Sequence, residues 1–358
     1  MRLKRREFLR YSSSTFLFSG LSFLSTASEE FSFSRDIEMR MSRIENPLGP
    51  PNIEKSKVKD LSHPYHLYDS QDSELKNLKL AIRKKEDLNS DQSLNVSPGS
   101  SFFLEKIIKD LGPNYDFAVT LNLDYYKVIF LLHYYKLETK TIKYKKNLSV
   151  KDYHKKINGK RAFVYLSNPN QPVGHFFTSV ELEWLVSKNP TSIFIVDEAY
   201  IEFYKNYEKH TSVGLTKKYK NVFISRTFSK IYGLASQRIG YFICHKIWNK
   251  NDFWGHFQEF TIGHHSIVCA KYSLSNHEYV NKSRDLSNRL RQDFYLKCLE
   301  KKVEYIGGHA NYSLIRVSNK IKGNIKKYKF PVNNYFLDNH SLLRITHFDS
   351  NKYYNNLF

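Results

Sequence analysis

The sequence is poor in cysteine, and the few cysteines that it has are not grouped. Cys244, Cys269 and Cys298 lie far apart, and no two of them form a Cys-x-x-Cys motif. A zinc site or a framework of disulfides needs cysteines at short spacings, so neither is predicted. Two pairs of histidines occur, His63 with His66 and His264 with His265. Neither pair has an acidic or cysteine residue at metal-ligand spacing. No metal site is therefore expected.

A long hydrophobic run and an excess of acidic residues are also missing. The 358 residues are 41% hydrophobic and 25% charged, which is ordinary for a globular protein. This composition excludes a multi-span membrane protein and a disordered chain. The length is sufficient for one large domain and a smaller one, with a substantial core.

Basic residues outnumber acidic ones, with 56 Lys and Arg against 35 Asp and Glu and a formal net charge of +21. Such a balance occurs in proteins that bind nucleic acid or anionic surfaces. The charge is scattered, however, and its densest run, residues 140–161, matches no nucleic-acid module. We predict a solvated basic face there and no nucleic-acid partner, with a nucleic-acid site as the less favoured alternative.

The first 27 residues have the features of an export signal. Arg5 and Arg6 are followed by Glu-Phe-Leu, then by a serine-rich apolar segment at 16–24 and by small residues up to Ala27. This order resembles a twin-arginine signal and predicts a periplasmic or otherwise exported protein. The apolar segment is too short and too polar for stable membrane anchoring. The alternative is a chance pair of arginines before a short buried helix, which leaves the protein in the cytoplasm.

Downstream, short β-rich runs alternate with helical stretches. Residues 161–166, 192–196 and 221–225 read as buried strands, and Thr178 and Glu181 form a capping box that opens a helix between the first two. This alternation favours an α/β fold with a parallel sheet.

Polar residues follow each of these three predicted strands. Gln171 follows the first strand, Asp197 and Tyr200 follow the second, and Lys230 follows the third. Because ligands bind at the carboxyl ends of the strands in open α/β sheets, these four side chains are predicted to converge on one ligand.

An earlier segment offers a site for an anion. Gly99, Ser100 and Ser101 lie between a short predicted strand and an amphipathic helix, and a helix N-terminus favours phosphate. Taken alone, the segment is better interpreted as an ordinary serine-capped helix. Three more residues that can donate hydrogen bonds to a phosphate lie near Lys230 in the sequence: Thr227, Ser229 and Arg238. The two groups together predict a phosphorylated cofactor.

Five motifs, in order along the chain, resemble those of fold-type I pyridoxal-phosphate aminotransferases of class I/II. They are ENPLGP at 45–50, NPNQPVG at 168–174, DEAYIEF at 197–203, RTFSKIYGLASQRIGY at 226–241 and LLRIT at 342–346. The similarity is closest to the histidinol-phosphate aminotransferase branch and covers nearly the whole chain after the export signal.

The resemblance implies an α/β fold with a mainly parallel central sheet flanked by helices. It also implies a smaller α+β domain built from the C-terminal part and an N-terminal arm. The expected division is a signal peptide at 1–27, an arm at 28–62 that packs on the small domain, a large cofactor-binding domain at 63–262 and a small domain at 263–358.

The same resemblance implies catalytic roles for pyridoxal 5′-phosphate and its partners. Lys230 forms the Schiff base with the cofactor and carries a proton between the substrate Cα and the cofactor C4′. Asp197 keeps the pyridine nitrogen protonated, and Tyr200 donates a hydrogen bond to O3′. Arg344 binds the substrate α-carboxylate through both ends of its guanidinium group.

Further contacts follow from the resemblance. The expected phosphate ligands are Ser100, Ser101, Thr227, Ser229 and Arg238. Tyr125 is expected to stack on the cofactor ring, although core packing explains it equally well. Tyr68 is expected to reach the phosphate of the other subunit's cofactor, which implies a homodimer with shared sites. Asn46 and Phe330 are expected to contact the substrate.

Departures from the family pattern shape the substrate prediction. Gln171 replaces the usual asparagine at O3′, and Ser101 is followed by Phe102 where the family has acidic residues. Phe330 stands where an arginine tends to bind substrate phosphate, so histidinol phosphate is not the expected substrate. An amino acid with an apolar or aromatic side chain fits better. His347 follows the arginine motif, and its role is not predicted.

The leading functional hypothesis is exchange of an amino group between an amino acid and a 2-oxo acid. A decarboxylase or racemase on the same fold would retain Lys230 and Asp197. A non-catalytic protein that binds the cofactor or an amino acid is the alternative from another class.

Overall fold

The structure is a computed structural model that describes residues 44–52, 74–249, 261–328, 333–337, 340–348, 354, 357 and 358. All of them belong to one compact unit, 40–358. The export-signal prediction, Tyr68 and Phe330 lie outside the described residues, and so do His63 and His66. The predicted domain boundaries stay predictions.

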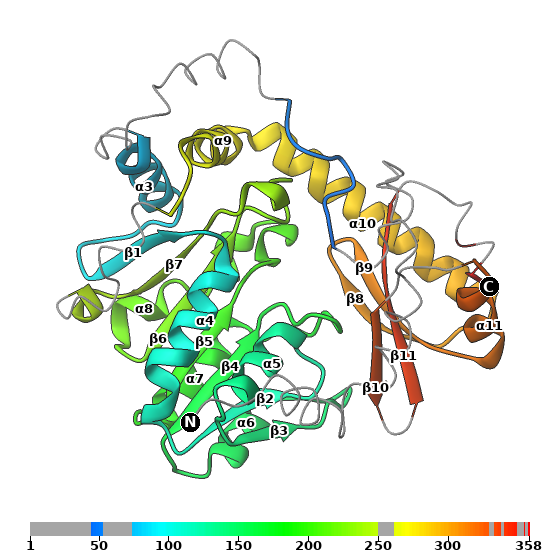
Figure 1. Cartoon of the computed structure of the whole chain (residues 1–358), viewed down its shortest axis with the longest axis horizontal. Helices are drawn as coiled ribbons and strands as arrows, with labels where there is room; N and C mark the ends of the chain where they lie inside the picture. The colour runs from blue at the N-terminus through cyan, green and yellow to red at the C-terminus, as the bar shows by residue number, and fades with distance from the viewer. Residues whose placement is uncertain are drawn as a thin grey trace, which may run out of the picture. The chain divides into compact units, whose positions relative to one another are not determined.

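A seven-stranded sheet forms the larger part of this unit (Figure 1). Its strands are β1 (Gln92–Ser97), β2 (Phe117–Leu121), β3 (Thr139–Ile142), β4 (Ala162–Ser167), β5 (Ile193–Asp197), β6 (Val222–Thr227) and β7 (Gly240–His245). Their order is β1-β7-β6-β5-β4-β2-β3. Strands β6, β5, β4, β2 and β3 run parallel, whereas β7 is antiparallel to both of its neighbours. The predicted mainly parallel sheet is confirmed.

Alternating side chains of the central strands bury both faces of this sheet. Phe163 and Tyr165 of β4 pack on one face, in a cluster with α4 (Ser100–Leu111) and α5 (Tyr126–Tyr134). Val164 and Leu166 pack on the other face, in a cluster with α6 (Val150–Ile157) and α7 (Ser179–Lys188). Because strand side chains point alternately to opposite faces, one continuous apolar run fills two cores.

The predicted capping box is confirmed at the start of α7. The Thr178 side chain accepts a hydrogen bond from the Glu181 backbone N–H, and the Glu181 carboxylate accepts one from the Thr178 backbone N–H. The helix at 100–111 differs from a serine-capped one, because its N-cap is Gly99 and no side chain caps it.

A second, antiparallel sheet has the strand order β10-β11-β9-β8. Its strands are β8 (Tyr305–His309), β9 (Tyr312–Arg316), β10 (Asn333–Leu337) and β11 (His340–Thr346). One face packs on α10 (His277–Glu300) and α11 (Asn319–Tyr328), through Phe294, Ile321 and Ile345. The smaller C-terminal sheet domain expected from the sequence is present, and α10 runs from the large sheet to it (Figure 1).

The remaining described elements are short or lie beside the large sheet. They are α3 (Glu74–Lys85), α8 (Leu215–Lys218), α9 (His264–Ser275) and the 3₁₀ turns η4 (Gly112–Asn114), η5 (Ile201–Phe203), η6 (Tyr207–Lys209), η7 (Ala235–Gln237) and η8 (Lys246–Asn249). Helices α3 and α9 pack side by side. Among the described elements, no helix has both the length and the apolar character to cross a bilayer.

His347 belongs to the core of the smaller sheet domain. One ring nitrogen lies 2.8 Å from Ser313 Oγ and the other lies 2.8 Å from Tyr354 Oη. Burial lowers the pKa of the imidazole to about 3, so the ring is neutral and acts as a hydrogen-bonding core residue.

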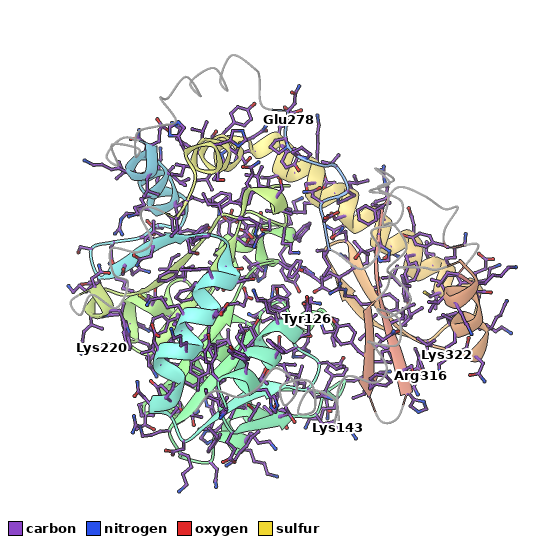
Figure 2. The ribbon with its side chains drawn as sticks, in the orientation of Figure 1. Tyr126, Lys143, Lys220, Glu278, Arg316 and Lys322 are labelled. Atoms are coloured by element: carbon purple, nitrogen blue, oxygen red, sulfur yellow. The ribbon has the colours of Figure 1, made fainter. Side chains whose placement is uncertain are left out.

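The basic charge is dispersed over the described surface. Lys143, Lys220 and Lys322 are exposed and lie at separate edges of the view in Figure 2. Seven lysines within 140–161 are exposed, as predicted for a solvated basic face, and they are Lys143, Lys145, Lys146, Lys151, Lys155, Lys156 and Lys160.

Candidate functional site

Lys230 lies in the connection between β6 and β7, at the carboxyl end of β6. Its Nζ donates a hydrogen bond to the Ile44 carbonyl oxygen at 2.8 Å and lies 5.4 Å from the centre of the Tyr200 ring. Burial, together with the nearby cations Arg344 and Arg238, lowers the pKa of Lys230 to about 7. A lysine in this state is substantially a neutral amine at physiological pH, which is the nucleophilic form.

Asp197 ends β5, the strand next to β6, and is 5% exposed. Its Oδ2 accepts a hydrogen bond from the Tyr165 hydroxyl at 3.1 Å. Its Oδ1 has no hydrogen-bond partner within the described part of the chain, although the Ala199 N–H and the Ser225 hydroxyl lie near enough to lower the pKa of the carboxyl group against the larger effect of burial. Burial raises the pKa of Asp197 to about 6. A buried carboxylate oxygen without a partner fits a donor supplied by a ligand.

The predicted phosphate ligands gather at the N-terminus of α4. Gly99 has φ 77°, and a Cβ atom there would lie 2.7 Å from Arg238 Nη2. A Cβ atom on Gly240 would lie 2.7 Å from the backbone nitrogen of Ser100. Both glycines therefore keep a space in which backbone N–H groups and the Arg238 guanidinium come together.

Two hydroxyl residues of the β6–β7 connection join this group. Arg238 Nη1 donates to Ser229 Oγ at 3.4 Å, and the Ser229 backbone N–H donates to Thr227 Oγ1 at 3.1 Å. Ser101 lies within hydrogen-bonding reach of the Tyr125 hydroxyl, which lowers the pKa of Tyr125 against the larger rise caused by burial. The structure thus brings Ser100, Ser101, Tyr125, Thr227, Ser229 and Arg238 into one region.

Gln171 and Arg344 meet at the hydroxyl of Tyr335. Gln171 Nε2 donates to Tyr335 Oη at 3.1 Å, and Arg344 Nη1 donates to the same oxygen at 3.5 Å. Arg344 is 4% exposed and lowers the pKa of Lys230 by its charge. The longer amide thus reaches the smaller sheet domain, while its predicted role at the cofactor O3′ remains a prediction.

Asn46 supports the lysine-bearing connection from the N-terminal segment. Its Nδ2 lies within hydrogen-bond distance of the Lys230 and Ile231 carbonyl oxygens, at 3.2 and 2.8 Å, and of Ser283 Oγ at 2.6 Å. Its Oδ1 accepts from the Leu48 N–H at 3.0 Å. These contacts make Asn46 a positioning residue in this structure, and its predicted substrate contact remains a prediction.

Asp124 is a buried carboxyl group in this region that the sequence analysis missed. Its Oδ1 accepts hydrogen bonds from Ser167 Oγ and, at 2.8 Å, from the Tyr125 N–H, while its Oδ2 has no described partner. Burial raises the pKa of Asp124 to about 8, so the group is mainly neutral at pH 7. In the sequence, the only indication that Asp124 belongs to the site is its position next to Tyr125, and an aspartate before two tyrosines matches no motif.

A buried ion cluster behind the site was also missed. Arg226 binds Glu198 and Glu202 at 2.9 Å and Glu86 at 3.4 Å, and its side chain is 0% exposed. Lys85 adds a second cation beside Glu86 and Glu202. Glu198 and Arg226 adjoin Asp197 and Thr227 in the sequence, so the cluster holds the two site strands in register.

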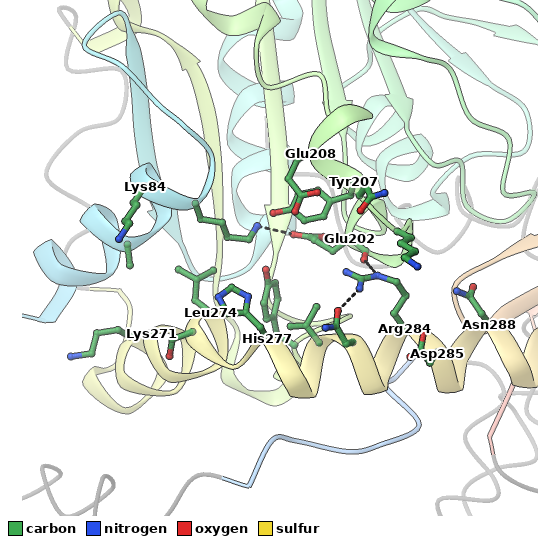
Figure 3. A pocket seen from close by; sticks show the side chains of 18 residues that line it. Lys84, Glu202, Tyr207, Glu208, Lys271, Leu274, His277, Arg284, Asp285 and Asn288 are labelled. Atoms are coloured by element: carbon green, nitrogen blue, oxygen red, sulfur yellow. Dashed lines mark hydrogen bonds and ion pairs between the residues drawn. The ribbon is translucent and has the colours of Figure 1, made fainter.

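A separate cavity of about 1020 Å³ lies between α3, the η5–η6 region and the α9–α10 helices (Figure 3). Its lining includes Lys84, Glu202, Tyr207, Arg284 and Asn288. Lys230, Asp197 and Arg344 do not line it, so this space is distinct from the candidate site.

The described residues contain no group of three or more His, Cys, Asp or Glu able to hold a metal ion. His265 instead lies 3.0 Å from Gln237 Oε1. All three cysteines are buried and free.

Comparisons with known proteins identify the family and the fold. The sequence model of the family described as aminotransferase class I and II matches residues 57–342. The chain is 30% identical over 292 residues to histidinol-phosphate aminotransferase 2 of Haemophilus influenzae, covering 77% of this chain and 75% of the relative. It is 28% identical over 293 residues to histidinol-phosphate aminotransferase of Caldicellulosiruptor saccharolyticus, covering 78% of each chain.

Solved structures share the fold. Histidinol-phosphate aminotransferase from Clostridium acetobutylicum superimposes with a TM-score of 0.77 at 20% identity, over 88% of this chain and 97% of that one. The Sinorhizobium meliloti enzyme, in complex with pyridoxal-5′-phosphate, gives 0.73 at 16% identity over 88% of each chain. L-threonine-O-3-phosphate decarboxylase from Porphyromonas gingivalis superimposes with a TM-score of 0.72 at 20% identity, over 88% of this chain and 96% of that one.

The fold is therefore that of the fold-type I pyridoxal-phosphate enzymes. Since the family match spans most of the sequence and a relative at 30% identity is a histidinol-phosphate aminotransferase, this chain belongs to the class I and II aminotransferase family, close to that branch.

Proposed function

We propose that the protein is a pyridoxal-phosphate-dependent aminotransferase that moves an amino group between an amino acid and a 2-oxo acid. The observation that carries the proposal is the pairing of Lys230, whose pKa is lowered to about 7, with Asp197, which has a buried oxygen without a described partner. Asp197 ends β5, and Lys230 follows the end of the neighbouring parallel strand β6, at the edge where α/β sheets bind ligands.

The residues present fit pyridoxal phosphate. The Asp197 Oδ1 atom needs a donor, and a protonated ring nitrogen is one. The space kept open by Gly99 and Gly240, beside the α4 N-terminus and Arg238, suits a phosphate. When bound, the cofactor supplies a cationic ring that accepts the electron pair left at the substrate Cα.

The chain's own groups then bind and move protons. Lys230 is the residue that attaches the cofactor and, once released, carries a proton to and from the substrate Cα through Nζ. Asp197 holds positive charge on the ring nitrogen, because a nearby anion favours the cation. Arg344 orients the substrate by binding its carboxylate at two points.

The substrate proposed is an α-amino acid with an apolar or aromatic side chain. The relatives named above are histidinol-phosphate aminotransferases, but this chain has Phe330 where a phosphate-binding arginine would be expected. The buried Arg344 and the aromatic Tyr335 and Tyr126 supply a carboxylate site beside apolar surface. Tyr126 is exposed on the first turn of α5, toward β10 (Figure 2).

The first experiment is visible absorption of the purified protein with pyridoxal phosphate. We expect a band in the wild type and in Lys220→Ala, an exposed-lysine control, but none in Lys230→Ala. One amino acid of a panel should bleach the band, and a 2-oxo acid should restore it. A band that Lys230→Ala retains would overturn the assignment of the lysine.

Decarboxylation is the second candidate, because a decarboxylase shares the fold. A decarboxylase would release carbon dioxide from the bleaching amino acid, and a racemase would invert it without any need for a 2-oxo acid. A non-catalytic binding protein would show the Lys230-dependent band but no bleaching by any amino acid.

We further propose export by the twin-arginine route, which rests on the order of residues in 1–27. Changing Arg5 and Arg6 together to lysine should retain the protein in the cytoplasm. Unchanged localisation would remove the export proposal and leave the enzyme proposal intact.

We propose a homodimer with shared sites, in which Tyr68 reaches the partner's cofactor phosphate. Sedimentation should give a dimer mass. Lys230→Ala and Tyr68→Phe should each be impaired alone, whereas co-expressing them should restore part of the activity, because one site of the heterodimer is then complete. No recovery from a confirmed heterodimer would contradict shared sites.

A further inference from the structure

Tyr335 links Gln171, the amide predicted to face the cofactor, to Arg344, the arginine predicted to bind the substrate. It lies on β10, opposite Leu342 of β11, while Arg344 lies opposite Asn333. In an antiparallel ladder these diagonal positions share a face of the sheet. That face packs on Leu123 and Val173. Leu123 is two positions before Tyr125 in the sequence, and Val173 is two positions after Gln171.

The hydrogen bonds of the Tyr335 hydroxyl leave its own hydrogen available. A tyrosine hydroxyl has two acceptor lone pairs and one donor hydrogen. Gln171 Nε2 and Arg344 Nη1 both donate to the oxygen, at 3.1 and 3.5 Å. Burial raises the pKa of Tyr335, so the hydroxyl is protonated at neutral pH. No acceptor for this hydrogen is found in the part of the chain that the structure describes.

We infer that Tyr335 is a second ligand of the substrate α-carboxylate and acts together with Arg344. This rests on the proposed function. The Arg344 guanidinium and the Gln171 amide both donate to the Tyr335 oxygen, so the hydroxyl hydrogen is left to donate to a bound acceptor. The acceptor expected next to Arg344 is the substrate carboxylate. A phenylalanine ring would pack equally well but could not donate.

The inference also narrows the substrate class. Two donors for one carboxylate favour substrates that carry an α-carboxylate over amino alcohols and their phosphates, because a buried donor without an acceptor is costly. Through Gln171, the same hydroxyl connects carboxylate binding to the loop after β4. Gln171 is thus positioned from the substrate side, which accounts for the longer amide at this position.

The test compares wild type with Tyr335→Phe, which removes only the hydroxyl. The probes are 2-methylalanine, which lacks a Cα hydrogen, and its amide, which lacks the carboxylate charge. Binding to the cofactor-loaded protein is measured by isothermal titration calorimetry. Phe336→Leu is the matched control, since Phe336 is 56% exposed and lies on the opposite face of β10.

We expect Tyr335→Phe to bind 2-methylalanine about 10- to 100-fold more weakly, which is the typical effect of losing a hydrogen bond to a charged group. Binding of the amide and the cofactor band should be unchanged, and Phe336→Leu should match wild type. KM for the amino acid should rise more than kcat falls. In the double variant Tyr335→Phe with Arg344→Lys, the fold-loss of affinity for 2-methylalanine should be smaller than the product of the fold-losses in the two single variants.

Equal affinity of wild type and Tyr335→Phe for 2-methylalanine would overturn the inference, as would an equal loss for the amide. Failure of the proposed function looks different, because the wild type then shows no Lys230-dependent band before any probe is added.

Discussion

Arg226 Nε donates to Glu198 Oε2 at 2.9 Å across the β5–β6 pair, and neither side chain is exposed. Each partner adjoins a site residue, since Glu198 follows Asp197 and Arg226 precedes Thr227. A second bond, from Arg226 to Glu202, ties the same arginine to the segment after Tyr200. The two strand ends that carry the candidate site are therefore held together from behind by a buried ion cluster.

Replacing this arginine should be strongly destabilising. Arg226→Met leaves Glu86, Glu198 and Glu202 buried without their main cation, and such a change costs about 3–5 kcal/mol of the free energy of unfolding. Urea denaturation followed by circular dichroism measures it. Lys218→Ala, which removes an exposed ion pair to Glu183, is the control and should leave the midpoint unchanged. Equal midpoints for both variants would show that the cluster contributes no stability.

Attachment of the cofactor should depend on pH through Lys230. The pKa of its amine is lowered to about 7, so the reactive neutral form increases as pH rises through 7 and is nearly complete by pH 9. The initial rate of band formation should follow this curve. Arg344→Met should move the midpoint to higher pH, because the guanidinium charge is one cause of the lowering. A wild-type midpoint above pH 9 would contradict the assigned environment.

Asp124 should make stability fall as pH rises. The folded-state pKa is raised to about 8 from an ordinary value near 4, so the folded protein retains a proton that the unfolded chain has lost. This contribution is complete below pH 4 and is lost as pH rises through 8. Asp124→Asn removes this contribution. The free energy of unfolding of the variant minus that of wild type should therefore increase as pH rises from 5 to 8. A constant difference across this range would exclude a raised pKa.

Arg344→Lys should weaken substrate binding without loss of the cofactor. Lysine keeps the charge but cannot bind a carboxylate at two points, so KM for the amino acid should rise about 10- to 100-fold. Steady-state kinetics and the visible band measure the two effects. Arg316→Lys, on the neighbouring strand β9 and paired with Glu304, is the control. An unchanged KM in Arg344→Lys would remove the arginine from the substrate site.

Much of the local structure was predictable from the sequence. Strands β4, β5 and β6 and the capping box of α7 lie where the patterns placed them, because continuous apolar runs and the Thr178–Glu181 pair act over a few residues. The grouping of Asp197 and Lys230 followed from the rule that parallel strands share a carboxyl edge. The antiparallel direction of β7 was not predicted, because strand direction depends on which neighbour a strand joins.

The sequence by itself determined the family, the lysine and the order of the site segments, since these depend on residue types at short spacing. Only the tertiary structure decided that Gln171 reaches Tyr335, 164 positions away, and that Arg226 and Glu86, 140 positions apart, share one buried cluster. It also decided that Lys230 and Asp124 have strongly shifted pKa values. Those properties arise from desolvation and from charges on distant segments, which no local pattern encodes.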